Sequence, residues 1–384
     1  MSRFVKRFSL LVSLLFVTPL WAAQQLIPAA PQIAATGYII MDADTGEVIA
    51  EKNARKRFPP ASLTKMMTSY ITEYELTKGN IGLNDKVLVS EKAWKSEGSR
   101  MFIKEGTQVE VGKLLKGIII QSGNDASVAM AEYIAGSETA FASLMNQHAE
   151  LLGMKDTHFG NATGLPMEGH YSSAYDLAIL AQAIIQRYPQ HYGIYSEKFF
   201  TYNNIRQPNR NKLLWRDKTV DGLKTGHTNE AGYCLVASAK RDGMRLITVV
   251  LGTKSEEARA QESQKLLAYG FRFYRTHKLY SANDQLSVAK VWGGAGDAVR
   301  LGLAEGLSVT IPRGQAKGLK ATMDINNDIK APVVAGQSYG VVRVTLDGKE
   351  VRQVPLVAMD SVQEGGFFKK LWHSILLFFI GLLN

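Results

Sequence analysis

Two hairpin patterns lie near the two ends of the first 280 residues, and they constrain the fold more than any other feature of the sequence. Residues 37–54 alternate around a turn at Asp44-Thr45-Gly46, and residues 231–252 hold two apolar runs that flank Arg241-Asp242-Gly243. This pattern is typical of antiparallel strands joined by tight turns. Helical periodicity fills most of the remaining sequence up to residue 280, with helices expected at 61–78, 111–121, 125–136, 138–153, 173–187 and 256–275. The pattern predicts an α/β (α+β) domain at 30–280, with an antiparallel sheet covered by helices.

The pattern changes near residue 283, where helical periodicity ends. Short alternating segments follow, separated by Gly, Pro, Asn and Asp, and Asp347-Gly348 lies between two apolar runs as a strong hairpin signal. Residues 283–362 are therefore predicted to form a small all-β domain, a sandwich by default.

The N-terminus has the features of an exported chain. Residues 1–23 combine three cations, an apolar run too short to span a bilayer, and Ala22-Ala23, which is the pattern of a signal peptide. Cleavage would lower the formal net charge from +10 to +7. An uncleaved membrane anchor is the alternative. A single cysteine, Cys234, excludes an internal disulfide, and its strand-like surroundings predict a buried filler.

The last segment, residues 365–384, is predicted to be an amphipathic helix. At helical spacing one face collects Phe368, Leu371, Trp372, Ile375, Phe379 and Leu382. The unbroken apolar run at 375–383 is too short to cross a bilayer, so residues 367–384 are expected to lie on a membrane surface. The alternatives are packing in a soluble core or against a second copy in a homodimer. The positive charge fits lipid headgroups or anionic wall polymers, whereas the absence of a dense basic block disfavours nucleic acid.

Ser62 and Lys65 stand three residues apart at the expected start of the helix at 61–78. On a helix they share one face, so the amine could remove the hydroxyl proton if burial or a nearby cation kept it neutral. By itself the pair is weak evidence, since an N-cap serine beside a solvated lysine has the same sequence. A second copy, Ser287 and Lys290, lies in a strand-like segment where the two side chains would point to opposite faces.

Two further motifs make catalysis the better interpretation. Ser122-Gly123-Asn124 follows an apolar run, and Lys224-Thr225-Gly226 leads into the second hairpin. Ser122 could relay a proton to a leaving amine, and Asn124 could hold a substrate amide. Lys224 could keep Lys65 neutral and attract an anion. Thr225 on an edge strand could bind a carboxylate, while Gly226 would let a peptide lie against that strand.

The three motifs in this order are typical of penicillin-binding proteins and class A β-lactamases. With the segments "FPPASLTKMMTSY", "QSGNDASVAMAEYIAG", "IRQPNRNKLLW", "VDGLKTGHTNEAGY" and "KLLAYGFRFYRTHK", the mature chain resembles the D-alanyl-D-alanine carboxypeptidases of the penicillin-binding protein 5 and 6 type. The resemblance implies a transpeptidase-like domain, a β-sandwich stalk and a helix on the periplasmic face of the inner membrane. Two loops, in residues 93–102 and 157–173, depart from the expected pattern, so substrate preference is less certain than the reaction.

The resemblance also implies roles for individual residues. Ser62 would be the acylated nucleophile, Lys65 its base, Ser122 the relay and Lys224 an electrostatic partner. The backbone N–H groups of Ser62 and His227 would form the oxyanion hole, and Thr225 and Arg259 would hold the substrate carboxylate. Asp176 and Arg206 would order a loop beside the site. Taken alone, Arg259 could equally be a helix-surface arginine.

The expected reaction is removal of the terminal D-alanine from peptidoglycan pentapeptide stems, with β-lactams as covalent inhibitors of the same serine. A serine β-lactamase, a D,D-endopeptidase and an inactive, membrane-tethered wall-binding protein are the alternatives. No Glu-x-x-x-Asn motif lies between Ser122 and Lys224, which disfavours the β-lactamase, and the intact trio disfavours the inactive protein. No cofactor is expected, and the seven scattered histidines without a His-Glu-x-x-His pattern predict no metal site.

Overall fold

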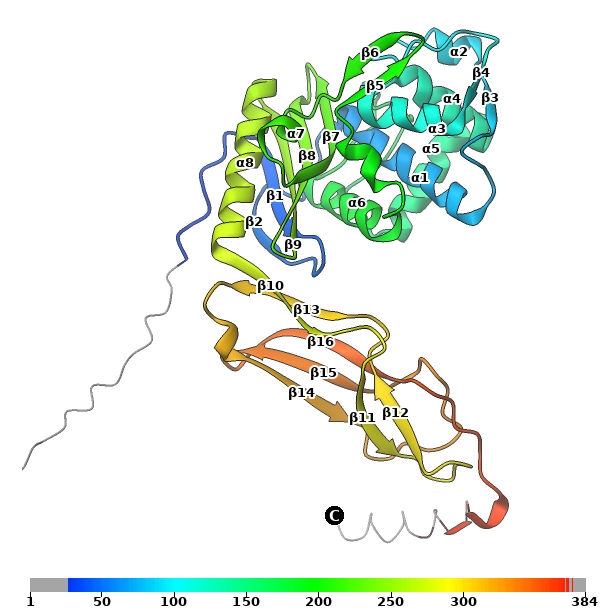
Figure 1. The fold of residues 1–384 in the computed structure, drawn as a ribbon, viewed down its shortest axis with the longest axis vertical. Helices are drawn as coiled ribbons and strands as arrows, with labels where there is room; N and C mark the ends of the chain where they lie inside the picture. The colour runs from blue at the N-terminus through cyan, green and yellow to red at the C-terminus, as the bar shows by residue number, and fades with distance from the viewer. Residues whose placement is uncertain (1–26, 370, 373–374, 376–384) are drawn as a thin grey trace, which may run out of the picture.

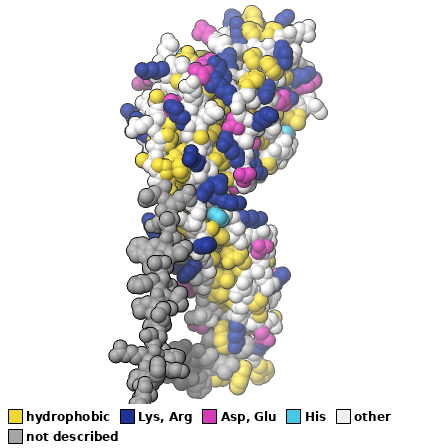
Figure 2. Space-filling model, turned by 60° about the vertical axis from the view of Figure 1, so that its left-hand side comes forward, with side chains coloured by type: hydrophobic (Ala, Val, Ile, Leu, Met, Phe, Trp, Pro, Cys, Tyr) yellow, Lys and Arg dark blue, Asp and Glu magenta, His cyan; other side chains and the backbone are white. Residues whose placement is uncertain are grey.

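The computed structural model describes residues 27–369, 371–372 and 375. Two domains lie one above the other along the long axis, and helix α8 (Glu256–Phe273) leads directly from the upper domain into the lower one (Figure 1). Lysine and arginine side chains are spread over one face of both domains and gather where the domains meet (Figure 2), in keeping with the formal charge of +10.

The upper domain is built on a five-stranded antiparallel sheet in the order β2-β1-β9-β8-β7. Both predicted hairpins are present, and the sheet combines them. The strands are β1 (Gly37–Asp42), β2 (Val48–Lys52), β7 (Val220–Thr228), β8 (Gly232–Arg241) and β9 (Met244–Thr253). Because β7 is the last strand in this order, one of its edges is left for a further strand.

Helices cover both faces of this sheet, because its central strands are apolar on both sides. Along β1, Ile39 and Met41 join the core under α1, α5 and α6, whereas Tyr38 and Ile40 join the core under α8. The helices on the first side and around the site are α1 (Lys65–Lys78), α3 (Val111–Lys116), α4 (Asn124–Ala135), α5 (Glu138–Leu151) and α6 (Ala174–Arg187). These elements agree with the predicted α/β domain.

Two predicted helices are irregular where they approach the site. The helix expected at 61–78 starts with a 3₁₀ turn at Ala61–Thr64, and the one expected at 111–121 continues from α3 into a π-helical turn at Gly117–Gln121. Sequence periodicity missed several short elements. These are β3 (Lys86–Leu88), α2 (Glu91–Trp94), β4 (Gln108–Glu110), a 3₁₀ turn at Tyr192–Ser196, β5 (Phe199–Tyr202), β6 (Ile205–Pro208), α7 (Leu213–Arg216) and a 3₁₀ turn at Ala316–Gly318.

The lower domain consists of two sheets that share one core, as the sequence predicted. One sheet pairs β10 with β13, and the other has the order β11-β12-β16-β15-β14. Asp347 and Gly348 both have positive φ, as a two-residue hairpin turn requires. The strands are β10 (Tyr274–Tyr280), β11 (Gln285–Lys290), β12 (Ala298–Gly302), β13 (Leu307–Pro312), β14 (Leu319–Ile325), β15 (Ser338–Leu346) and β16 (Lys349–Ala358).

The division between the domains differs from the predicted one. Residues 274–280 were assigned to the first domain, but β10 pairs with β13 of the sandwich throughout its length. The two domains also touch through side chains. The Thr45 and Thr310 hydroxyls lie 2.7 Å apart, and Arg352 donates to the Thr45 carbonyl at 3.0 Å.

The two predicted terminal segments lie wholly or partly outside the described residues. The signal-peptide prediction, residues 1–23, lies wholly outside them. Of the C-terminal helix, the described residues are helical from Phe367, and the side chains of Phe367, Phe368, Leu371, Trp372 and Ile375 are exposed. Within the described part of the chain, no helix has the length and apolar character needed to cross a membrane.

Candidate active site

Ser62 lies in a strained turn that two glycines hold in place. The preceding residue, Ala61, has φ +48°, a conformation that L-residues rarely adopt and that tends to occur at functional sites. A Cβ on Gly226 of β7 would lie 3.1 Å from the Pro60 carbonyl oxygen, and one on Gly164 would lie 1.9 Å from the Ala61 carbonyl oxygen. The turn therefore sits between the edge strand and the loop at 161–164, and only glycine fits at the closest contact.

Lys65 is buried directly behind the serine. Its Nζ donates to Ser62 Oγ at 3.2 Å, to Asn124 Oδ1 at 2.6 Å and to the Thr163 carbonyl at 2.5 Å. Burial, with a smaller contribution from the charge of Arg210, lowers the pKa of Lys65 from 10.5 to about 7, against the opposing effect of Asp125. An amine with this pKa can lose its proton near neutral pH and accept the one on Ser62.

The second motif holds Lys65 in place. The side-chain carbonyl of Asn124 accepts from Lys65, and its Nδ2 donates to the Glu97 carbonyl at 2.6 Å; its predicted contact with a substrate amide stays a prediction. Beside it, the Asp125 carboxylate accepts from the backbone N–H groups of Met101, Phe102 and Ile103. Asn124 thus orients the lysine, and Asp125 fixes the loop that follows α2.

Ser122 ends the π-helical turn in the left-handed conformation, at φ +61°. Its hydroxyl is buried, has no hydrogen-bond partner among the described residues, and lines the same cavity as Ser62. A buried hydroxyl that lacks a partner can donate to or accept from a bound substrate without breaking an existing bond.

Edge strand β7 brings a second buried amine, Lys224, to the site. Its Nζ donates to the Thr225 carbonyl at 3.1 Å. Burial is the largest cause that holds the pKa of Lys224 well below 10.5, followed by the charges of Lys65, Arg210 and Arg259. The sequence predicted that Lys224 would keep Lys65 neutral. Burial and the charge of Arg210 lower the pKa of Lys65, and repulsion between the two amines additionally disfavours protonation of both at once.

The cavity in front of Ser62, called here the serine cavity, has a volume of about 230 Å³. Arg259 is buried beside it, donates to the Gly226 carbonyl at 3.2 Å, and is not a surface residue of α8. Glu256 lies 3.9 Å from its guanidinium. The cavity is lined by Ser62, Ser99, Ser122, Arg210, Thr225, Gly226, His227, Tyr233, Glu256 and Arg259. Two arginines and one acid in its wall, with Lys224 close behind, make it suited to an anionic group.

Of the three remaining predicted residues, His227 lines this cavity, whereas Asp176 and Arg206 do not. The ring of His227 is exposed and stacks on Tyr233, with centroids 4.0 Å apart. Asp176 is buried at the start of α6 and accepts from the Asp156 N–H and the Thr157 hydroxyl, so it fixes the start of the loop that runs on to residue 173. Arg206 lies on β6, where its guanidinium stacks over the Phe199 ring.

Sequence reasoning missed Arg210, which the structure places in the cavity wall. The signal for it was Asn-Arg-Asn. Asn209 donates to the Tyr195 and Glu197 carbonyls, and Asn211 donates to the Gly222 carbonyl. The two buried amides fix the backbone on both sides of Arg210, as asparagine does in many tight turns.

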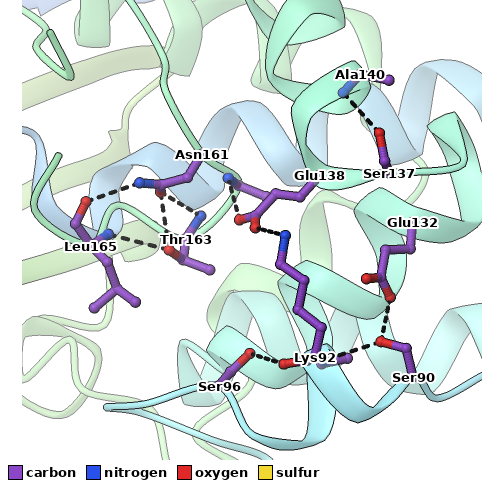
Figure 3. Close-up of polar contacts among 12 residues, drawn as sticks. Ser90, Lys92, Ser96, Glu132, Ser137, Glu138, Ala140, Asn161, Thr163 and Leu165 are labelled. Atoms are coloured by element: carbon purple, nitrogen blue, oxygen red, sulfur yellow. Dashed lines mark hydrogen bonds and ion pairs between the residues drawn. The ribbon is translucent and has the colours of Figure 1, made fainter. Parts of the chain in front are cut away.

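The loop at 161–165 was also missed, although it supplies the Thr163 carbonyl that accepts from Lys65. The Asn161 side chain accepts from Thr163 and donates to the Leu165 carbonyl (Figure 3). It also accepts from the Gly164 N–H. Glu138, at the start of α5, accepts from the Ala162 N–H and forms an ion pair with Lys92 of α2 (Figure 3). The loop is therefore held from within and from two helices.

His170 fixes the segment that follows this loop to the 3₁₀ turn that precedes α1. Its Nδ1 accepts from the Gly160 N–H, so its Nε2 carries the proton and donates to the Thr64 hydroxyl at 2.8 Å. Burial, with smaller contributions from His158 and Lys65, lowers the pKa of His170 to about 4, so the ring stays neutral at neutral pH. In the described part of the chain no cluster of His, Cys, Asp and Glu is arranged to hold a metal ion.

Comparisons with known proteins agree with this geometry. Residues 24–255 match the D-alanyl-D-alanine carboxypeptidase family, and residues 274–364 match the C-terminal domain of penicillin-binding protein 5. The chain is 46% identical over 373 residues to D-alanyl-D-alanine carboxypeptidase DacC of Escherichia coli, covering 95% of this chain and 93% of that protein.

Two solved structures extend the comparison. Penicillin-binding protein 5 from Haemophilus influenzae superposes with a TM-score of 0.83 at 43% identity, over 88% of this chain and 100% of that chain. Penicillin-binding protein D2 from Listeria monocytogenes, solved in an ampicillin-bound form, has a TM-score of 0.58 at 29% identity, over 63% of this chain and 100% of that chain.

Proposed function

The chain belongs to the D-alanyl-D-alanine carboxypeptidase family, and from that premise we propose which of its residues carry out the reaction. The protein is a serine-type D-Ala-D-Ala carboxypeptidase of the cell wall, a hydrolase that acts on peptidoglycan and binds β-lactams. The observation that supports our assignment best is the buried Lys65 amine, which lies 3.2 Å from Ser62 Oγ and has a pKa of about 7.

In the first step, neutral Lys65 takes the proton from Ser62 as Oγ attacks the carbonyl carbon of the penultimate D-alanine. The backbone N–H groups of Ser62 and His227 stabilise the oxyanion, in a turn that Gly226 and Gly164 hold rigid. The scissile C–N bond then breaks, and Ser122 relays to the departing D-alanine amine the proton that Lys65 took from Ser62, which leaves Lys65 neutral again. Water hydrolyses the acyl-enzyme and regenerates Ser62.

The leaving D-alanine is recognised through its carboxylate. Arg259 and Thr225 would bind it, with Lys224 and Arg210 adding positive potential. The peptide would extend along the free edge of β7 as an additional strand. Asn124 Oδ1 positions Lys65, while only one of the two Nδ2 hydrogens is used, by the Glu97 carbonyl, so the other could still donate to a substrate amide as the sequence predicted. The roles of Asp176 and Arg206 in ordering a loop remain predictions.

The direct test is release of free D-alanine from diacetyl-Lys-D-Ala-D-Ala by the chain without its last 18 or so residues. The intact sequence should release D-alanine and take up fluorescent penicillin covalently, whereas Ser62→Ala should do neither. Uptake of penicillin without D-alanine release would leave Ser62 reactive but assign it another substrate. Release by Ser62→Ala would refute the assignment.

We further propose that the mature protein is exported and held at the periplasmic face of the inner membrane by residues 367–384. The described part of the C-terminal helix lies at the opposite end of the molecule from the catalytic domain (Figure 1), and the side chains of Phe367, Phe368, Leu371, Trp372 and Ile375 are exposed. The sandwich would then hold the serine cavity away from the bilayer. Co-sedimentation of the full chain, but not the truncated one, with anionic lipid vesicles supports this anchor. Equal sedimentation of both would contradict it.

A further inference from the structure

A second and larger cavity, of about 550 Å³, lies beside the serine cavity. We call it the loop cavity. Its wall consists of residues 57–61, residues 164–171, Thr228 and Glu230. The proposed mechanism uses none of these side chains. It involves this wall only through the turn that carries Ser62.

The two cavities follow one another along the edge of β7. The serine cavity is lined by Thr225, Gly226 and His227, and the loop cavity by Thr228 and Glu230. Arg210 and Arg259 line only the serine cavity, which fixes the carboxylate end of a bound peptide there. Because a strand advances about 3.3 Å per residue, the residue before the D-alanyl-D-alanine unit would lie level with the loop cavity.

The charge of the wall changes between the two cavities. Glu168 and Glu230 are exposed at the loop cavity, and neither forms an ion pair with another described residue. The one cation in its wall, Arg57, is paired with Asp156 at 3.4 Å and lies over the Tyr171 ring. The loop cavity therefore presents carboxylates that lack a counter-charge, whereas the serine cavity presents arginines.

The same wall also has apolar surface. Leu165 and Met167 are 37% and 56% exposed, and they stand beside Pro60 and Phe58. The bonds from Asn161 and Glu138 hold the start of this loop without any ligand (Figure 3). A pre-formed cavity with apolar walls and carboxylates at its rim suits a flexible methylene chain that ends in a cation.

We propose that the loop cavity binds the side chain of the residue that precedes D-alanyl-D-alanine, and that Glu168 and Glu230 select a side chain ending in a protonated amine. The inference rests on the proposed role of Ser62 and on the binding direction that Arg259 sets. It assigns to these two acids a part in specificity and none in the chemical step.

The test compares two tripeptides that differ only in one charge: acetyl-Lys-D-Ala-D-Ala with a free ε-amine, and its diacetyl form with that amine blocked. For two exposed charge pairs, we expect kcat/KM to favour the free amine by about 3- to 10-fold at low ionic strength, and the preference to shrink as salt is added. In Glu168→Gln/Glu230→Gln the ratio should fall to about one, with the single variants between. Glu150→Gln, on an exposed position of α5, makes the same charge change as either single variant and should keep the original ratio.

Both peptides are measured on each preparation, so the ratio does not depend on how much of a variant is folded. Equal hydrolysis of the two peptides by the unaltered protein would overturn the inference while leaving the proposed function intact. A preference that survives in the double variant would also overturn it. If neither peptide releases D-alanine, the proposed function fails and the inference fails with it.

Discussion

Replacing Gly164 with alanine should disable the site through geometry alone. Gly164 has φ +83°, and an added Cβ would lie 1.9 Å from the Ala61 carbonyl oxygen and 2.9 Å from Thr64 Oγ1. Real Cβ atoms essentially never approach closer than 3.0 Å, so the loop must retreat from the Ser62 turn by about 1 Å. The neighbouring Thr163 carbonyl, 2.5 Å from Lys65 Nζ, would move with it.

The expected losses follow from these shifts. The left-handed backbone costs alanine about 1–2 kcal/mol, and the weakened bond to Lys65 adds about 1–2 kcal/mol, so Gly164→Ala should lower the free energy of unfolding by about 2–4 kcal/mol. A displacement of about 1 Å next to the base should slow acylation about 100-fold. Urea unfolding and the rate of covalent labelling by fluorescent penicillin measure the two effects.

Gly153→Ala provides the matched control. Gly153 has φ +76°, but nothing lies within 4 Å of the added Cβ, so only the backbone cost of about 1–2 kcal/mol applies and labelling should keep its rate. If Gly164→Ala labels at more than about a third of the original rate, the Ser62 turn does not depend on this contact, and our account of the site's rigidity is wrong.

Three further predictions concern charge. Arg210→Gln should raise the pKa of Lys65 and move the rising limb of the pH–rate profile to higher pH, whereas Arg216→Gln, which breaks the exposed pair with Glu257, should leave the limb in place. An unmoved limb in both variants would remove Arg210 from the mechanism. Arg259→Ala should lower kcat/KM for the peptide substrate about 100-fold, with partial recovery in Arg259→Lys. Equal activity of the unaltered protein and both variants would show that the substrate carboxylate binds elsewhere. The pKa of Lys65 is about 7 in the folded chain and ordinarily 10.5, so between these pH values the unfolded chain binds more protons and the free energy of unfolding should rise from pH 7 to pH 9. Urea unfolding measures this change. A urea midpoint that falls over this range, or that rises equally in Lys65→Met, would contradict the burial of a neutral amine.

Local sequence patterns predicted much of the fold, because the signals lie close together along the chain. The Asp347-Gly348 turn and the hairpin around Arg241-Asp242-Gly243 both form as expected. The boundary near β10 was misplaced because a strand that follows a helix directly shows which sheet it joins only through a distant partner, β13. Strands of three or four residues, such as β3 and β4, are too short for any period to be recognised.

The sequence likewise predicted only part of the candidate site. Motif spacing identified Ser62, Lys65, Ser122, Asn124 and Lys224, and the folded chain brings these residues together. Motif spacing did not reveal that Asn124 would hold Lys65, because that bond joins residues 59 positions apart. Arg210 and the Thr163 carbonyl were missed for the same reason. Each acts on Lys65 across more than 90 residues of sequence, and a backbone carbonyl leaves no signature in the identity of its residue.

The most direct test of the central claim, that a buried neutral Lys65 activates Ser62, is the rate of Ser62 acylation by a β-lactam as a function of pH. The account predicts a rate that increases about tenfold per pH unit at low pH and levels off above a pKa of about 7, with the label on Ser62 in peptide mapping. A rate that is flat between pH 5.5 and 9, or one that rises only near the ordinary lysine pKa of 10.5, would contradict it.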